Sequence, residues 1–361
     1  MTAEKPGGRR LPRRSVLALA ALTLPAACSA DPAPPSPAAA LPTTASPTPS
    51  ATSARPSAKP SPSPSKSASP SPKPAKAAPR RGGPVPFEPG TALLGSYLSL
   101  SGKSLRESLA LRRRQLGREQ RIVHVFYPWD GYVPSSEPAV ASSSTLMVSW
   151  HGAPYAGIVD GSSDRIIARV AKKLAGMKRP VLLRWGWEMN GDWFAWGGAG
   201  NGRDTAGYVK AWKRLHRIFG EHGADNVAWV WSPNWNSGPD ESWNRFSRYY
   251  PGDEYVDWVG VSGYDFFAET PKTLFTPVLK AYGSRKPIIL SETAAVSGVG
   301  VSKAAWIGKL ASWVERTPEV GAVVWFDTDT QDDSEHNFRP DTDGAALAAY
   351  RKMVRSKRFS G

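Results

Sequence analysis

From residue 91 onward, eight short runs of β-branched and aromatic residues alternate with amphipathic stretches. This alternation is expected of repeated βα units around a parallel sheet. Several runs are apolar on both sides, as at 323–326, which is typical of strands covered by helices outside and by side chains inside. Eight such units predict an α/β fold of the (β/α)8 TIM-barrel type. The expected strands are 91–99, 122–129, 145–151, 181–188, 226–234, 257–265, 287–293 and 321–327.

Amphipathic stretches between these runs predict the helices of the barrel. The second and fifth connections between strands look short or irregular, so we expect no regular helix there. The expected helices are 103–116, 163–176, 205–220, 271–282, 302–316 and 341–357.

The first 84 residues differ in composition from the rest of the chain. They hold 19 of the 34 prolines, whereas all 15 tryptophans lie between Trp129 and Trp325. Residues 29–84 are mostly Ser, Pro, Ala, Thr and Lys, and such a segment cannot bury enough apolar surface to offset its chain entropy. We therefore expect a disordered linker at 29–84 and one catalytic domain at 85–361.

The net charge of +15 raises the question of a nucleic-acid partner. Residues 1–84 carry 12 Lys and Arg against 2 Asp and Glu, a net of +10, which leaves only +5 for the rest of the chain. The basic segment also lacks interleaved aromatic residues. We therefore expect no nucleic-acid partner.

An export signal is predicted at 1–28. A basic stretch at 9–14 precedes an apolar run at 15–27, too short to span a bilayer, and the pair resembles a twin-arginine signal. The run ends at Cys28 in a sequence that resembles a bacterial lipobox, which predicts lipidation of Cys28 and a location at the outer face of the cytoplasmic membrane. Pro25 stands where a lipobox usually has Leu, so cleavage and secretion without a lipid is the alternative. Cys28 is the only cysteine, which excludes a disulfide framework and a cysteine-based metal site.

Carboxylates and indoles gather at the expected carboxyl ends of the strands, where TIM barrels place their catalytic groups. Indole faces stack on the apolar faces of sugar rings, and the polar groups can bond sugar hydroxyls. The pattern therefore favours a carbohydrate site. The residues concerned are Trp129, Asp130, Trp150, His151, Glu188, Met189, Asn190, Pro233, Asn234, Tyr264, Asp265, Glu292, Trp325, Phe326 and Asp327.

Glu188 and Glu292 each end an otherwise apolar run, on the expected fourth and seventh strands. These strands lie across the barrel mouth from each other. Two carboxyl groups about 5 to 5.5 Å apart perform retaining glycoside hydrolysis, in which one donates a proton and the other attacks the sugar. The alternative is that one or both glutamates are structural and pair with Arg184 or another arginine of the barrel.

The chain resembles glycoside hydrolase family 26, a clan A family of retaining TIM-barrel enzymes dominated by β-1,4-mannanases. The resemblance covers about residues 90 to 340, and several independent motifs occur in the same order. The strongest is 184–197, supported by 230–234, 250–253, 257–264, 286–292 and 324–326.

The resemblance implies that Glu188 is the acid/base and Glu292 the nucleophile. It further implies that Tyr264 bonds the nucleophile, that Trp325 forms the floor under the sugar at the cleavage subsite, and that Trp193 contacts the sugar near the scissile bond.

Three further residues are less defined by the resemblance. His151 could reach a sugar hydroxyl or be a packed or capping histidine, and Asn190 and Asn234 could shape the loops that carry them. Trp187 departs from the family, whose members commonly have His before the acid/base. An indole has one donor and no acceptor, so the hydroxyl pattern recognised at the cleavage subsite is expected to differ from that of the family.

These observations predict an exported, monomeric, retaining endo-β-glycosidase acting on β-1,4-mannan-type polysaccharide, with no metal and no cofactor. A β-1,3/1,4-glucanase or a β-1,3-xylanase of the same family is the first alternative. A non-catalytic surface protein that binds polysaccharide is the second. The acidic segment 331–336 is read as a solvated loop rather than a cation site.

Overall fold

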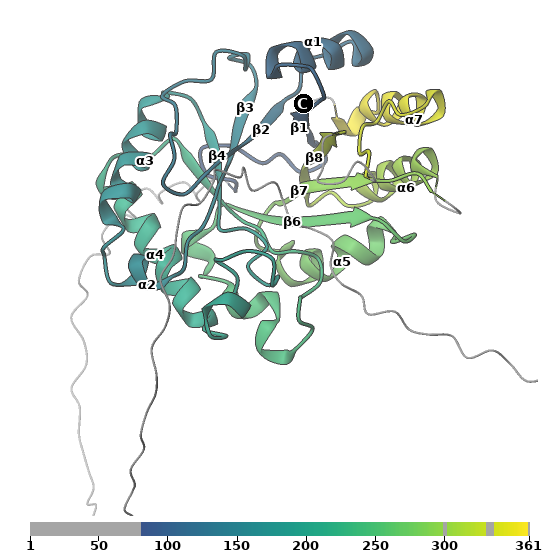
Figure 1. Ribbon diagram of the computed structural model, residues 1–361. Helices are drawn as coiled ribbons and strands as arrows, with labels where there is room; N and C mark the ends of the chain where they lie inside the picture. Colours follow the sequence, from purple (N-terminus) through teal and green to yellow (C-terminus); the bar gives the residue numbers. More distant parts are fainter. Residues whose placement is uncertain (1–80, 299–301, 330–335, 360–361) are drawn as a thin grey trace, which may run out of the picture. The chain divides into compact units, whose positions relative to one another are not determined.

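Eight parallel strands close into a barrel in chain order, and helices surround it (Figure 1). This computed structural model describes residues 81–298, 302–329 and 336–359. The barrel prediction is confirmed, and each expected strand overlaps an observed one. The strands are β1 Leu93–Ser99, β2 Ile122–Tyr127, β3 Thr145–Trp150, β4 Val181–Trp185, β5 Val227–Trp231, β6 Trp258–Asp265, β7 Ile288–Ala295 and β8 Val320–Thr328.

All six expected helices are present, and one short helix, α2, was not expected. The link between β2 and β3 contains no helix, and the link between β5 and β6 contains only 3-10 turns, so both irregular connections are confirmed. The helices are α1 Leu105–Leu116, α2 Ala156–Val159, α3 Asp164–Gly176, α4 Thr205–Glu221, α5 Pro271–Tyr282, α6 Lys303–Glu315 and α7 Gly344–Val354. The 3-10 turns are η1 Ala199–Asn201, η2 Ser242–Asn244, η3 Phe246–Tyr249, η4 Asp253–Tyr255 and η5 Lys357–Phe359.

Local signals in the sequence set the ends of these helices. At α1, the Ser104 side chain accepts a bond from the Glu107 amide, and the Glu107 carboxylate accepts one from the Ser104 amide. This capping box satisfies amides that have no partner within the helix. Gly117 ends α1 in the left-handed conformation, with φ of 74°. The last expected helix, 341–357, is shorter than predicted because the Asp343 side chain caps it at its start and a 3-10 turn replaces its end.

A small apolar cluster fills the barrel interior near the amino ends of the strands. It includes Met147 of β3, Leu182 of β4 and Val324 of β8, all fully buried. The Trp258 indole bonds the carbonyls of Gly82 and Val85, both at 3.0 Å. Packing therefore begins before the predicted domain boundary at residue 85.

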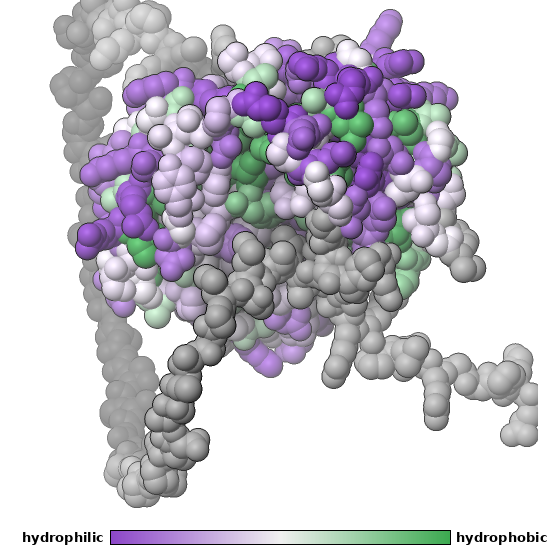
Figure 2. Space-filling model, turned by 45° about the horizontal axis from the view of Figure 1, so that its top comes forward, coloured by the Kyte–Doolittle hydropathy of each residue, from purple (hydrophilic) through white to green (hydrophobic). Residues whose placement is uncertain are grey.

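The predicted signal at 1–28 and nearly all of the predicted linker lie outside the described residues, as does most of the 331–336 loop. Within the part of the chain that the structure describes, no helix is long and apolar enough to cross a membrane. Hydrophilic side chains cover much of the face shown in Figure 2, with smaller apolar areas between them.

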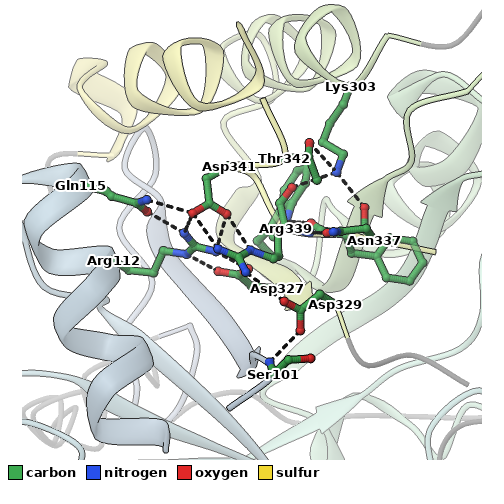
Figure 3. A network of polar contacts seen from close by, with 12 residues as sticks. Ser101, Arg112, Gln115, Lys303, Asp327, Asp329, Asn337, Arg339, Asp341 and Thr342 are labelled. Atoms are coloured by element: carbon green, nitrogen blue, oxygen red, sulfur yellow. Dashed lines mark hydrogen bonds and ion pairs between the residues drawn. The ribbon is translucent and has the colours of Figure 1, made fainter. Parts of the chain in front are cut away.

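A buried ionic network joins α1 to β8 beside the barrel mouth (Figure 3). Two nitrogens of Arg112 donate to the Asp327 carboxylate, at 2.5 and 2.7 Å, and the third lies 2.8 Å from Asp341. Arg339 bonds both Asp341 and Asp329. Because Arg112 and Asp327 are almost completely buried, each stabilises a charge that water cannot reach.

Lys303, the first residue of α6, fixes the segment that leads from β8 to α7 (Figure 3). Its ammonium group donates to the carbonyls of Asn337 and Arg339, at 2.7 and 2.8 Å, and to the Thr342 hydroxyl at 3.2 Å. Burial lowers the pKa of Lys303 to about 8. The end of β8 is thus held from two sides, by α1 and by α6.

Replacing Asp327 with alanine should destabilise the protein by roughly 3 to 5 kcal/mol, because Arg112 would keep a buried charge without its bidentate partner. Urea unfolding measures the change. The matched control is Glu119→Ala, which removes the exposed partner of Arg113, one residue away on α1, and should change the free energy of unfolding by less than about 1 kcal/mol. Equal losses in the two variants would contradict a structural role for the network.

Candidate active site

Glu188 and Glu292 come together at the carboxyl ends of the barrel strands. Glu292 lies within β7, and Glu188 follows β4 by three residues. Both side chains are fully buried. The sequence prediction that the two glutamates share the barrel mouth therefore agrees with their positions.

One guanidinium group holds both carboxyl groups. Arg184 of β4 pairs closely with Glu292 Oε1, and its Nη2 lies 3.8 Å from Glu188 Oε1. Arg184 also donates to the hydroxyls of Ser262, at 2.6 Å, and Ser149, at 3.2 Å. The pairing with Arg184 that the alternative interpretation required is present, but it joins two carboxyl groups to one cation. A single positive charge cannot neutralise both, which favours a proton on one of them.

The backbone around Glu188 is strained. Glu188 has a φ of 52°, a left-handed conformation that is costly for a residue with a side chain, and Gly186 has a φ of 51°. The Glu188 amide bonds the Ser232 carbonyl at 2.8 Å, and the Glu188 carbonyl accepts from the Gly191 amide at 2.8 Å. The predicted strand 181–188 is therefore too long: β4 ends at Trp185, and the left-handed turn redirects Glu188.

Glu188 binds a proton more tightly than an ordinary glutamate does. Burial, and after it repulsion from Glu292, raise the pKa of Glu188 to about 7, against the opposing effect of Arg184. The Trp193 indole donates to Glu188 Oε2 at 2.9 Å. Glu188 Oε1 has no hydrogen-bond partner among the described residues. A carboxyl group in this state can donate a proton near neutral pH.

Glu292 is held as a hydrogen-bond acceptor at both oxygens. Tyr264 donates to Oε2 at 2.6 Å, and Arg184 donates to Oε1. Burial, and after it the charge of Glu292, raise the pKa of the Tyr264 hydroxyl well above its usual range, so that this hydroxyl keeps its proton and donates. Two donors aimed at one carboxyl group hold it in a single orientation.

Trp187 and His151 lie together at the ends of β4 and β3. Trp187 is fully buried, with its ring centroid 5.2 Å from those of Phe126 and of His151, and the Arg184 guanidinium lies 5.1 Å from the Trp187 ring centroid. The Trp187 indole nitrogen has no partner among the described residues. Burial lowers the pKa of His151, so the imidazole is neutral at pH 7.

The role expected of Trp325 is wrong. Its ring faces away from the mouth, packs against Trp306 and Tyr350 and donates to the Phe338 carbonyl at 2.7 Å. Successive residues of a strand point to opposite faces, and Val324 points inward. The ring that β8 contributes to the mouth is therefore that of Phe326, stacked on Tyr97 at 4.8 Å.

Asn190 joins the loops that follow β4 and β5. Its side-chain nitrogen donates to the carbonyls of Asn234 and Asn236, at 3.0 and 3.1 Å, and its oxygen accepts from the Asn234 amide at 2.9 Å. These bonds agree with the loop-shaping role that was one interpretation of Asn190 and Asn234.

The aromatic lining of the mouth was not predicted from the sequence, and a contact of Arg184 with both glutamates was expected only under the alternative interpretation. Phe126, Tyr97 and Phe326 pack in a chain around the mouth. Arg184 opens the strongest family-like motif, and that position was the available signal for a role at the site. Among residues 81–298, 302–329 and 336–359, no group of three or more His, Cys, Asp or Glu side chains is placed to hold a metal ion.

The chain is similar to known proteins in sequence and in fold. Residues 143–307 match the model of glycosyl hydrolase family 26. The chain is 31% identical over 257 residues to endoglucanase H of Acetivibrio thermocellus, which covers 66% of this chain and 28% of that protein. It is 29% identical over 160 residues to a mannan endo-1,4-beta-mannosidase of Bacillus subtilis, covering 40% of this chain and 42% of that protein. It thus spans well under two thirds of either relative.

The chain is also similar to a further relative and to a solved structure. A beta-1,3-xylanase of Vibrio, TXYA, is 30% identical over 106 residues, covering 29% of this chain and 21% of that protein. The solved structure of BoMan26A, a GH26 beta-mannanase from Bacteroides ovatus, superposes with a TM-score of 0.56 at 20% identity, covering 75% of this chain and 90% of that chain. This structural likeness shows a shared fold.

Glu188→Gln should change how stability depends on pH. Folding raises the pKa of Glu188 from 4.5 to about 7, so the folded state binds this proton more tightly than the unfolded state does. The resulting stabilisation is fully present below pH 4.5 and is lost as the pH rises through 7. Relative to the glutamine variant, the wild type should therefore lose roughly 3 kcal/mol between about pH 4 and pH 8. Urea unfolding of both proteins across this range measures the difference, and parallel pH profiles would contradict a buried, neutral Glu188.

Proposed function

We propose that this chain, whose residues 143–307 match the model of glycosyl hydrolase family 26, is a retaining endo-β-glycosidase that cuts β-1,4-mannan-type polysaccharide. One observation carries the proposal: two buried carboxyl groups share one guanidinium, and one of them has a pKa of about 7. A proton donor and an ionised nucleophile are the pair that retaining hydrolysis needs.

In the first step, the Glu292 carboxylate attacks the anomeric carbon while Glu188 passes its proton to the leaving oxygen. The glycosidic bond breaks and a glycosyl ester forms on Glu292. In the second step, Glu188, now ionised, takes a proton from water, and the resulting nucleophile displaces Glu292 and restores both groups. Tyr264 and Arg184 orient Glu292 and stabilise its charge before attack and after release.

A second candidate substrate is a β-1,3/1,4-glucan or a β-1,3-xylan. Trp187 favours it, because an indole at this position offers no acceptor to a sugar hydroxyl where the family commonly has His. The names endoglucanase H and beta-1,3-xylanase among the relatives also support it. The remaining rival is a surface lectin that binds polysaccharide without cutting it.

We expect the purified chain to release reducing sugars from linear mannan, galactomannan or glucomannan, and Glu292→Ala to abolish release because it removes the nucleophile. Mixed-linkage glucan and β-1,3-xylan complete the substrate panel. Release from glucan or xylan alone would reject the mannan proposal in favour of the second candidate.

Two controls separate chemistry from binding. Retention requires that the first product keep the β configuration, which proton NMR of early product reports, and an α product would reject double displacement. Polysaccharide binding without release from any substrate would reject the enzyme and support the lectin.

We further propose that the chain is exported and anchored through Cys28, on the strength of the basic and apolar pattern before it. Cys28→Ser should move the protein from the membrane fraction to the medium or the soluble fraction, as immunoblotting of fractionated bacterial cells would detect. Equal membrane association of both proteins would reject the lipid anchor.

A further inference from the structure

Phe267 is unusually exposed for its size. Its side chain is 87% exposed, more than any other large apolar side chain among the described residues. A single exposed apolar residue is common and by itself needs no explanation. Two features of its surroundings, however, indicate a function for the Phe267 ring.

The first feature is that several hydrogen bonds hold the turn that carries Phe267. It links β6 to α5 (Figure 1). The Glu269 carboxylate accepts from the amides of Phe266 and Phe267, at 3.0 and 2.7 Å, and the Trp306 indole donates to the Glu269 carbonyl at 2.8 Å. Ala268 takes a left-handed conformation, with φ of 70°. Strain of this kind persists only where the surrounding bonds fix it.

The second feature is that Phe267 continues a row of rings from the catalytic centre. Tyr264, which bonds Glu292, lies 5.7 Å from Phe266 between ring centroids, and Phe266 lies 6.3 Å from Phe267. The row starts at the nucleophile and ends in solvent. A ligand that extends from the nucleophile along this side of the mouth would meet the Phe267 ring.

We propose that Phe267 is a platform for a sugar ring at an outer binding position, beyond the sugar that is cleaved. This inference rests on the proposed function, since it takes the ligand to be a polysaccharide. A phenyl ring has no hydrogen-bonding group, so it recognises the apolar C–H face of a sugar and not its hydroxyl pattern. The hydrogen bonds of the turn fix the backbone that carries the ring before binding, which lowers the entropy lost on association.

The platform predicts that affinity depends on ligand length through Phe267. In the full chain carrying Glu292→Ala, calorimetry would measure the Kd of mannan and mixed-linkage glucan oligosaccharides of increasing length. Adding Phe267→Ala should weaken the longest ligands about tenfold and leave the shortest within about twofold. Phe267→Tyr should restore the affinity because it keeps the ring. Val159→Ala, which trims an exposed apolar side chain on α2, is the matched control and should change nothing.

The outcomes distinguish this inference from the proposed function. If the Glu292→Ala protein binds no oligosaccharide, the proposed function fails. If it binds and Phe267→Ala binds equally well at every length, only the platform is overturned. Equal weakening at every length would also overturn it, since the turn would then act on the catalytic centre through Tyr264. Self-association that sedimentation detects and Phe267→Ala removes would assign the ring to an interface between copies.

Discussion

The buried guanidinium of Arg184 is the interaction on which the site depends. It lies between two carboxyl groups that are themselves fully buried, and it bonds two serine hydroxyls and faces the Trp187 ring. Removing such a group from water is costly unless its partners compensate. The two carboxyl groups compensate the buried charge of Arg184 unequally, because Glu292 is in close contact with the guanidinium and the nearest oxygen of Glu188 lies 3.8 Å from it. Burial, and after it repulsion from Glu292, raise the pKa of Glu188, which lies farther from the cation, to about 7.

The rest of the barrel keeps this arrangement in place. Gly186 and Glu188 leave the strand in left-handed conformations, and the carbonyl of Ser232 on the neighbouring segment holds the turn. On the other side, the Arg112 and Asp327 pair ties the end of β8 to α1, next to the inward-facing Phe326. The strain at Glu188 is local, and the stabilising contacts that permit it are spread over several strands.

The architecture could be predicted from sequence because eight apolar runs and six amphipathic stretches each have a clear period. Glu188 and Glu292 could be predicted because each interrupts an apolar run at its end. The face of β8 on which the Trp325 side chain lies could not be predicted, because a strand that is apolar on both sides shows no alternation of polar and apolar residues. A contact of Arg184 with both glutamates was expected only under the alternative interpretation, because it depends on side-chain positions from two strands that lie far apart in the sequence.

The hydrogen bonds of Asn190 restrict how the loops after β4 and β5 can change in evolution. Asn190 contributes both donors and an acceptor to the loop after β5, and the Asn244 side chain returns a bond to its backbone carbonyl at 2.8 Å. The two loops therefore form one structural unit, and a change of length in either would disturb the strand end that carries Glu188. Among the described residues, hydrogen bonds within the turn after β6 and one from Trp306 hold that turn, and its Phe266 ring packs against Tyr264 and Phe338. A change of sequence in this turn would leave the bonds between Asn190 and the loop after β5 intact, and with them the strand end that carries Glu188.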